Sequence, residues 1–359
     1  MPAQLQAARE GQTLVLTLSN PELRNAIDPA MYAAGIEALN VAESSAEVRS
    51  VVITGAAGVF CSGGNLLRLQ ASRQADPQVQ AQSIEGLHSW IETIRTFPKP
   101  VIAAVEGAAA GAGFSLALAC DLVVAARNAV FVMAYSNVAL SPDGGASWSL
   151  SQALPRQLAT EILMCGDRLT AQRLHDLGIV NRVTEPGSAL ATALALAEQL
   201  NARAPNVLAS IKELVGDAPR NTLSAHLASE RDHFVKNLHH ANAGAGIAAF
   251  LDKHTPQYEW LPTSPPTHAP PAPHKVSGVL LWAKAADTQV TTLTVSARPS
   301  RDNGSVSSHT KDRPWTTRFL LSKNVKRSIQ VAGFHPSHHP FDTTSCDVPA
   351  SNASRMAAS

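Results

Sequence analysis

The amino-acid sequence predicts an α/β fold built on a largely parallel sheet. Runs rich in β-branched and aliphatic residues recur along the first third of the 359-residue chain, with segments of helical periodicity between them. Strands that alternate with helices indicate crossover connections, which parallel neighbouring strands require. The apolar content of 45% and the charged content of 16% allow a sizeable buried core.

The expected strands and helices follow from these periodicities. Strands are expected at residues 13–18, 51–54, 101–105 and 122–125, and helices between them at residues 29–43 and 83–97. From residue 148 to about 250 the pattern becomes almost wholly helical, with helices expected at residues 150–163, 171–177, 189–203, 207–215 and 222–237. A helical half of this size is expected to cover a sheet or to pack on another subunit.

A proline-rich stretch that begins at residue 261 predicts a domain boundary. Residues 1–260 form the predicted folded domain, and residues 261–359 are a Pro-, Ser-, Thr- and His-rich tail that we expect to be mostly disordered. The tail holds 11 Lys and Arg against 5 Asp and Glu, whereas the preceding residues hold 18 against 23. Because the net charge is only +1, we expect neither nucleic acid nor a membrane surface as a partner.

Cysteine usage and the apolar pattern indicate the compartment. Three of the four cysteines, Cys61, Cys120 and Cys165, lie among apolar or small residues, which suits reduced and packed thiols. The sequence begins without a basic segment followed by an apolar one, and no apolar run approaches ~20 residues. We therefore expect a cytoplasmic protein, and no residue spacing predicts a metal site.

Two short glycine-rich segments carry the functional signal. Residues 59–66 (Val-Phe-Cys-Ser-Gly-Gly-Asn-Leu) follow one expected strand, and residues 106–114 (Glu-Gly-Ala-Ala-Ala-Gly-Ala-Gly-Phe) join another to a helix. Small residues let a ligand approach the backbone closely, and free N–H groups point outward at a helix N-terminus. Each loop alone is more simply explained as a tight connection, but two of them could direct two donors at one oxygen.

Together, and in this order, these segments resemble the crotonase (enoyl-CoA hydratase/isomerase) superfamily. The resemblance spans roughly residues 5–258, and it is carried by residues 20–27, 60–66, 98–107, 117–121, 163–167, 177–180 and 250–253. It implies a repeated ββα spiral whose C-terminal helical region forms a homotrimer or a dimer of trimers. It also implies an acyl-CoA substrate and no cofactor, since coenzyme A is part of the substrate.

The resemblance assigns an oxyanion hole to the backbone N–H groups of Gly64 and Ala112. Two aligned donors stabilise the charge that accumulates on a thioester oxygen when an α-proton leaves. Arg24 and Lys253 match family positions that help to hold the coenzyme A phosphates, and Asn65, which replaces a family aspartate, could still cap a helix. The residues expected to bind substrate are Arg24, Ala26, Ser62, Gly63, Asn65, Leu66, Gly111, Ser115, Tyr135 and Lys253.

The carboxylates of a typical family hydratase are missing. Its two glutamates fall on Ser115 and Tyr135, so the usual acid and base for adding water are absent. One acidic residue remains nearby: Asp143, in residues 132–145, a segment that resembles isomerases of the phenylacetate-degradation branch, where this aspartate is the catalytic base. The Pro-Asp-Gly-Gly sequence around it is also a good turn in its own right.

The resemblance and the surviving carboxylate together predict double-bond isomerisation, with Asp143 as the proton shuttle. Two alternatives remain open at this point. The first is a hydratase or ring-opening hydrolase of an unsaturated or cyclic CoA thioester, in fatty-acid or aromatic-acid degradation. The second is a catalytically silent subunit that binds acyl-CoA.

Overall fold

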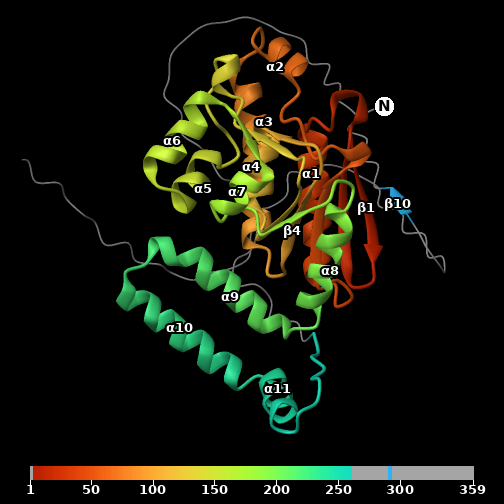
Figure 1. The fold of residues 1–359 in the computed structure, drawn as a ribbon, viewed down its shortest axis with the longest axis vertical. Coiled ribbons are helices and arrows are strands. Elements are labelled where there is room, and N and C mark those ends of the chain that lie inside the picture. Colours follow the sequence, from red (N-terminus) through yellow and green to blue (C-terminus); the bar gives the residue numbers. More distant parts are fainter. Residues whose placement is uncertain (1–2, 261–289, 293–359) are drawn as a thin grey trace, which may run out of the picture. The chain divides into compact units, whose positions relative to one another are not determined.

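A seven-stranded sheet lies at the centre of the fold (Figure 1). The computed structural model describes residues 3–260 and 290–292. The strand order is β10-β1-β2-β3-β4-β6-β9; β1 is antiparallel to both of its neighbours, and the other pairs are parallel. The strands are β1 (Gln4–Glu10), β2 (Thr13–Ser19), β3 (Ser50–Gly55), β4 (Val101–Val105), β6 (Leu122–Ala126), β9 (Arg182–Thr184) and β10 (Val290–Thr292).

Helices cover both faces of this sheet. Val51 and Ile53 of β3 belong to the core that contains α1 and α3, whereas Val52 faces the opposite core, which α8 covers. Successive strand residues point to opposite faces, so a strand covered on both sides is apolar throughout; all of β4 is buried for this reason. The predicted largely parallel sheet is therefore confirmed. The covering helices are α1 (Pro29–Ser44), α3 (Pro77–Thr96) and α8 (Ala189–Asn201).

A second, three-stranded sheet and several short helices complete the spiral. Its order is β5-β7-β8, in which β5 and β7 are parallel and β8 is antiparallel to β7. The strands are β5 (Ala108–Ala110), β7 (Val130–Val132) and β8 (Arg168–Thr170). The short helices are α2 (Leu66–Ser72), α4 (Ala112–Ala119), α5 (Ala146–Ala153), α6 (Arg156–Cys165) and α7 (Ala171–Asp176), and 3₁₀ turns lie at Pro21–Leu23, Ala56–Gly58, Ser136–Val138 and Ala218–Arg220.

Three local predictions needed correction. The single helix expected at residues 150–163 is two helices, because Pro155 forces the preceding Leu154 into an extended conformation (φ −128°, ψ 155°). Helix α3 begins at Pro77 rather than at residue 83, because the side chain of Asp76 caps it. Cys165 is exposed, whereas Cys61 and Cys120 are buried free thiols as expected.

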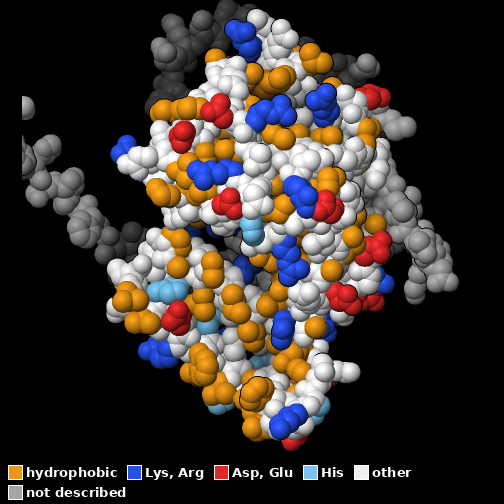
Figure 2. Space-filling view, viewed as in Figure 1, with side chains coloured by type: hydrophobic (Ala, Val, Ile, Leu, Met, Phe, Trp, Pro, Cys, Tyr) orange, Lys and Arg blue, Asp and Glu red, His pale blue; other side chains and the backbone are white. Residues whose placement is uncertain are grey.

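The helical region at the C-terminal end of the domain exposes many apolar side chains (Figure 2). It consists of α9 (Pro205–Asp217), α10 (Leu223–Leu238) and α11 (Ala241–Leu251). The exposed residues are Ile211, Val215, Leu223, Leu227, Phe234, Val235, Leu238, Ile247, Phe250 and Leu251. Large exposed apolar side chains that gather on one region are typical of an interaction site. None of the helices in the described ranges has both the length and the apolar character needed to cross a membrane.

Lys99 joins three segments at the seam between the sheet and the C-terminal helices. Its Nζ donates to the carbonyl oxygens of Ala42 (2.6 Å) and Ser45 (2.7 Å) at the end of α1, and it lies 4.0 Å from the ring centroid of Trp260. Only 1% of Lys99 is exposed. Burial disfavours the charged form and lowers its pKa to about 8.

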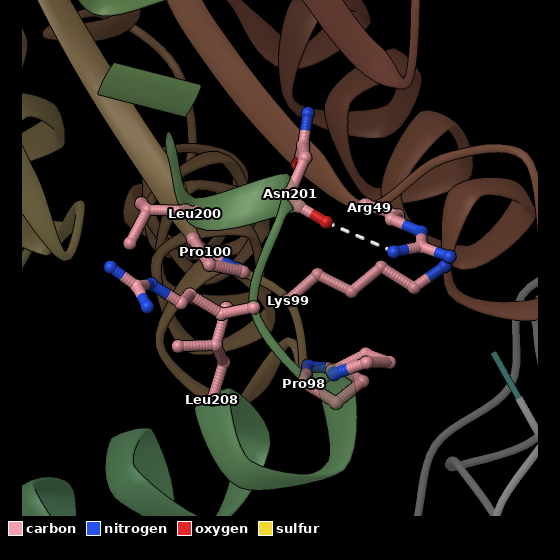
Figure 3. Close-up of a pocket in the computed structure, with 9 residues that line it drawn as sticks. Arg49, Pro98, Lys99, Pro100, Leu200, Asn201 and Leu208 are labelled. Carbon is pink, nitrogen blue, oxygen red and sulfur yellow. Dashed lines mark hydrogen bonds between the residues drawn. The ribbon is translucent and has the colours of Figure 1, made fainter. Parts of the chain in front are cut away.

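Residues 258–260 also make contacts in this region between the sheet and the C-terminal helices. Arg49 donates from Nη1 to the carbonyl oxygen of Asn201 (2.9 Å, Figure 3) and from Nη2 to that of Tyr258 (2.7 Å). The side chain of Asn242 bonds both the N–H and the carbonyl of Glu259, at 3.0 Å each. The end of the domain is therefore part of its packing. Apart from β10, which pairs with β1, the predicted disorder of residues 261–359 lies outside the described residues.

These contacts predict where the chain can be shortened. We expect a chain that ends at residue 260 to melt close to the full-length protein. A chain that ends at residue 255 loses partners of Arg49, Lys99 and Asn242, worth about 3 kcal/mol in all, which lowers Tm by roughly 6–12 °C. Thermal unfolding followed by circular dichroism measures the difference. Equal Tm losses in the two chains would contradict this and assign the stability to the residues beyond 260.

Candidate active site

The two glycine-rich segments lie side by side. A parallel bridge pairs Cys61 with Ala109 of β5, in which Cys61 N–H donates to the carbonyl of Ala108 (2.9 Å) and its carbonyl accepts from Ala110 N–H (2.9 Å). This bridge holds the loop after β3 against the strand that leads into α4. The two loops therefore lie next to each other, and their direction of two donors at one oxygen stays a prediction.

Glycine is required at the point of closest approach. Gly63 has φ +101°, and a Cβ on it would lie 2.8 Å from the carbonyl oxygen of Ala110 and 3.6 Å from Ala112 N. Gly113 would place a Cβ 2.6 Å from the carbonyl oxygen of Cys61. Real Cβ atoms do not approach backbone atoms this closely, so any larger residue would push the two loops apart.

The two amides expected to form an oxyanion hole are free to donate. Neither Gly64 N–H nor Ala112 N–H has a hydrogen-bond acceptor within residues 3–260 or 290–292. Ala112 is the first residue of α4, where unpaired N–H groups and the helix dipole favour a negative charge. The pair can stabilise an oxyanion, although the role of each amide remains a prediction.

Ser115, Tyr135 and Asp143 form a hydrogen-bonded group next to the second loop. The Tyr135 hydroxyl donates to Asp143 Oδ1 (2.5 Å), and Ser115 Oγ donates to the Asp143 carbonyl oxygen (3.0 Å) and lies 3.4 Å from the Tyr135 hydroxyl. Burial and the Asp143 carboxylate both raise the pKa of Tyr135, so this phenol remains a donor. Tyr135 thus contacts the predicted catalytic carboxylate, whereas Ser115 bonds the main chain of the same residue.

The segment at residues 20–27 is attached to the first loop. The N–H of Ser62 donates to the carbonyl of Arg24 (3.0 Å), and its Oγ donates to that of Leu23 (2.8 Å). Ile27 N–H in turn donates to the Gly63 carbonyl (2.9 Å). This arrangement brings the exposed Arg24 and the buried Ala26 beside Ser62, Gly63 and Gly64.

Of the remaining predicted residues, three lie at the loops and one lies beyond the last helix of the domain. Asn65 caps α2 by accepting a bond from Arg68 N–H (3.1 Å), the role left open by the sequence, and the exposed Leu66 begins this helix. Gly111 precedes α4, and its carbonyl accepts a bond from Ser115 Oγ (3.3 Å). Lys253 is exposed just beyond α11, a helix that lies well away from α4 in Figure 1.

Sequence reasoning missed the residues that surround the loop of Asp143. A Cβ on Gly144 would lie 3.5 Å from Leu87, and one on Gly145 would lie 3.9 Å from Ile91. Ser83, Leu87 and Ile91 recur every four residues and form one buried face of α3. That spacing is the signal that could have indicated them. Arg68 contacts the same face through Ser83, at 2.8 Å.

Comparison with known proteins identifies the family. A family model described as Enoyl-CoA hydratase/isomerase matches residues 8–260. The chain belongs to the enoyl-CoA hydratase/isomerase family. The crystal structure of an enoyl-CoA hydratase from Polaromonas sp. JS666 is similar to it, with 71% identity, a TM-score of 0.71, and coverage of 71% of this chain and 99% of the other. The crotonase-type fold predicted from the sequence is thereby confirmed.

Curated relatives of this enoyl-CoA hydratase/isomerase family member differ in activity. The 1,2-epoxyphenylacetyl-CoA isomerase of Escherichia coli (strain K12) is 36% identical over 254 residues, which cover 69% of this chain and 95% of that one. The 2,3-dehydroadipyl-CoA hydratase of the same organism is 32% identical over 257 residues, which cover 72% and 99%. Family membership therefore does not by itself distinguish isomerase from hydratase.

The site offers neither a reactive thiol nor a metal-binding cluster. Cys61 lies between the loops, but burial raises the pKa of its thiol to about 12, and its Sγ accepts a bond from Gly63 N–H (3.3 Å). Within the described part of the chain there is no group of three or more His, Cys, Asp or Glu residues that could hold a metal ion.

The contact at Gly63 yields a test of the loop geometry. Gly63→Ala should lower kcat on an enoyl-CoA substrate by roughly 10²- to 10³-fold, as does removal of one oxyanion donor, because the Cβ displaces the loop that carries Gly64. Gly187→Ala is the matched control, since its φ is also positive (+83°) but no atom lies within 4 Å of the added Cβ. The control should lose only ~1 kcal/mol of stability. Unchanged kcat in Gly63→Ala would contradict the assignment.

Proposed function

We propose that the chain moves a double bond within an acyl-CoA thioester and that Asp143 shuttles the proton. Membership of the enoyl-CoA hydratase/isomerase family supports the acyl-CoA substrate. The observation that carries the proposal is the hydrogen bond from the Tyr135 hydroxyl to the Asp143 carboxylate, while Ser115 bonds the Asp143 main chain. Tyr135 and Ser115 occupy the positions where a hydratase has its two glutamates. One carboxylate suits proton transfer between two carbons, because the group that removes the proton can also return it.

The proposed reaction begins when the thioester oxygen accepts bonds from Gly64 N–H and Ala112 N–H. Loss of a proton from the acyl chain to Asp143 places negative charge on this oxygen, and each preorganised donor lowers the barrier by ~3 kcal/mol. Asp143 then protonates the other end of the delocalised system, which completes the shift of the double bond. The Tyr135 hydroxyl orients the carboxylate, since its own raised pKa keeps it protonated.

The similar proteins support different outcomes. The isomerase from Escherichia coli favours double-bond or related isomerisation, whereas the 2,3-dehydroadipyl-CoA hydratase and the Polaromonas enoyl-CoA hydratase favour addition of water. In the second case Ser115 and Tyr135 would position a water molecule for Asp143. Ring-opening hydrolysis of a cyclic CoA thioester would use the same groups. A silent acyl-CoA-binding subunit is the remaining possibility if Asp143 has no effect on turnover.

Replacement of Asp143 separates these functions. Asp143→Asn should retain the fold and CoA binding, because the amide is nearly isosteric, but turnover should fall by ~10²- to 10⁴-fold. Exchange of substrate protons with deuterated solvent, followed by NMR, measures this step, and the product spectrum distinguishes a shifted double bond from a hydrated chain. Tyr135→Phe keeps the carboxylate and removes only its donor, so it should reduce exchange less. Undiminished exchange in Asp143→Asn would remove this residue from the mechanism.

We also propose a homotrimer or a dimer of trimers assembled through α9–α11. The apolar side chains exposed on these helices (Figure 2) support an interface between copies, and the position of Lys253 just after α11 suits a contribution to the site of a neighbour. Arg24 would then meet the coenzyme A phosphates from one chain and Lys253 from another.

Light scattering tests this assembly at micromolar concentration. The wild-type mass should correspond to three or six chains. Phe250→Glu should shift the mass toward the single chain, because Phe250 is 84% exposed in one chain and a charge there opposes burial. Leu67→Glu changes a similarly exposed residue on α2 (69%) and should leave the mass unchanged. A monomeric wild-type protein would contradict the proposal.

A further inference from the structure

Arg68 lies on a helix whose direction is set by the first glycine-rich loop. Asn65 caps α2 immediately after Gly64 by bonding Arg68 N–H. A Cβ on Gly64 would lie 3.7 Å from Leu69, so the Leu69 side chain lies near Gly64. Arg68, one position earlier, is half-buried, and its side chain reaches Ser83 of α3. The helix that follows the first loop therefore carries Arg68 to α3.

The guanidinium of Arg68 has no counter-charge. Its Nη2 donates to Ser83 Oγ (2.8 Å), its Nε is buried without an acceptor, and it forms no ion pair with any residue that the structure describes. A shielded donor without a partner costs free energy. The planar guanidinium is best satisfied by a carboxylate, which can accept two of its N–H groups at once.

The contact between Arg68 and α3 shows how far its guanidinium lies from the Asp143 loop. Leu87 lies against the loop of Asp143, since a Cβ on Gly144 would be 3.5 Å from its side chain, and Ser83 is one helical turn before Leu87. Four residues correspond to a rise of about 6 Å. The guanidinium that contacts Ser83 is thus displaced along α3 by about 6 Å from the level of the Asp143 loop, which is roughly the length of a few methylene groups.

Tyr32 lies in the same region. Its ring lies against α3, where a Cβ on Gly86 would be 3.4 Å from it. Burial raises the pKa of this phenol, Arg68 opposes the rise and Asp143 adds to it. Tyr32 is therefore within electrostatic reach of both Arg68 and Asp143.

We infer that Arg68 binds a carboxylate at the far end of the acyl group, so that the preferred substrates are ω-carboxyacyl-CoA thioesters. This assignment rests on the proposed function, since it names the substrate class of the same site. The substrate carboxylate supplies the missing partner for Nε, and the Tyr32 hydroxyl can donate a further bond. An acyl group that ends in a methyl would leave the guanidinium unsatisfied.

Binding of saturated thioesters tests the assignment without turnover. Titration calorimetry compares the monothioester of hexanedioic acid and CoA with hexanoyl-CoA, on wild type, Arg68→Met, Arg68→Lys and Arg73→Met. Wild type should bind the carboxylate-ended ligand at least tenfold more tightly. Arg68→Met should abolish this preference and leave hexanoyl-CoA affinity unchanged, and Arg68→Lys should restore part of it. Arg73 is exposed at the end of the same helix, so Arg73→Met should behave as wild type.

Two outcomes would overturn the assignment. Equal affinity of wild type for the two thioesters would mean that no acyl carboxylate is recognised. An equal loss of both affinities in Arg68→Met would place Arg68 on coenzyme A or in the support of α2. The proton-exchange result with Asp143→Asn is independent of these titrations, so failure of the isomerase proposal and failure of this one are separately visible.

Discussion

The site depends on the near contact between two backbone segments at Gly63 and Gly113. Strands β3 and β4 are parallel neighbours, so their carboxyl ends deliver the two loops to the same edge of the sheet. The bridge between Cys61 and Ala109 then closes the gap to a distance at which no side chain fits. The cap of α2 follows Gly63 by two residues, and α4 begins one residue before Gly113, so this contact fixes where both helices start.

The central fold could be predicted because its signals are local. The strands at β2, β3, β4 and β6 are runs rich in β-branched and aliphatic residues, and the glycines of both loops occur where strands end. The short strands β5, β7, β8 and β9 have only three residues each, too few to show a period. These short strands form because the tertiary fold places each of them beside a partner strand. A local sequence pattern does not reveal that placement.

The side-chain arrangement of the site was only partly predictable. Asp143 could be singled out as the remaining carboxylate, but its bond to Tyr135 depends on a 3₁₀ turn and on two consecutive glycines with positive φ, Gly144 and Gly145. The inward position of Arg68 could not be predicted either, because α2 is a short helix whose rotation is set by packing against α3 rather than by its own sequence. Such orientations require the assembled fold.

The two halves of the proposed chemistry are encoded differently. The donors at Gly64 and Ala112 are main-chain groups, which no side-chain replacement removes as long as the loop conformation is kept, whereas the proton-handling positions 115, 135 and 143 are ordinary side chains. Evolution can therefore exchange one or two residues and obtain a new reaction while the charge-stabilising step persists. A duplicated gene for such a protein would begin with both main-chain donors already in place.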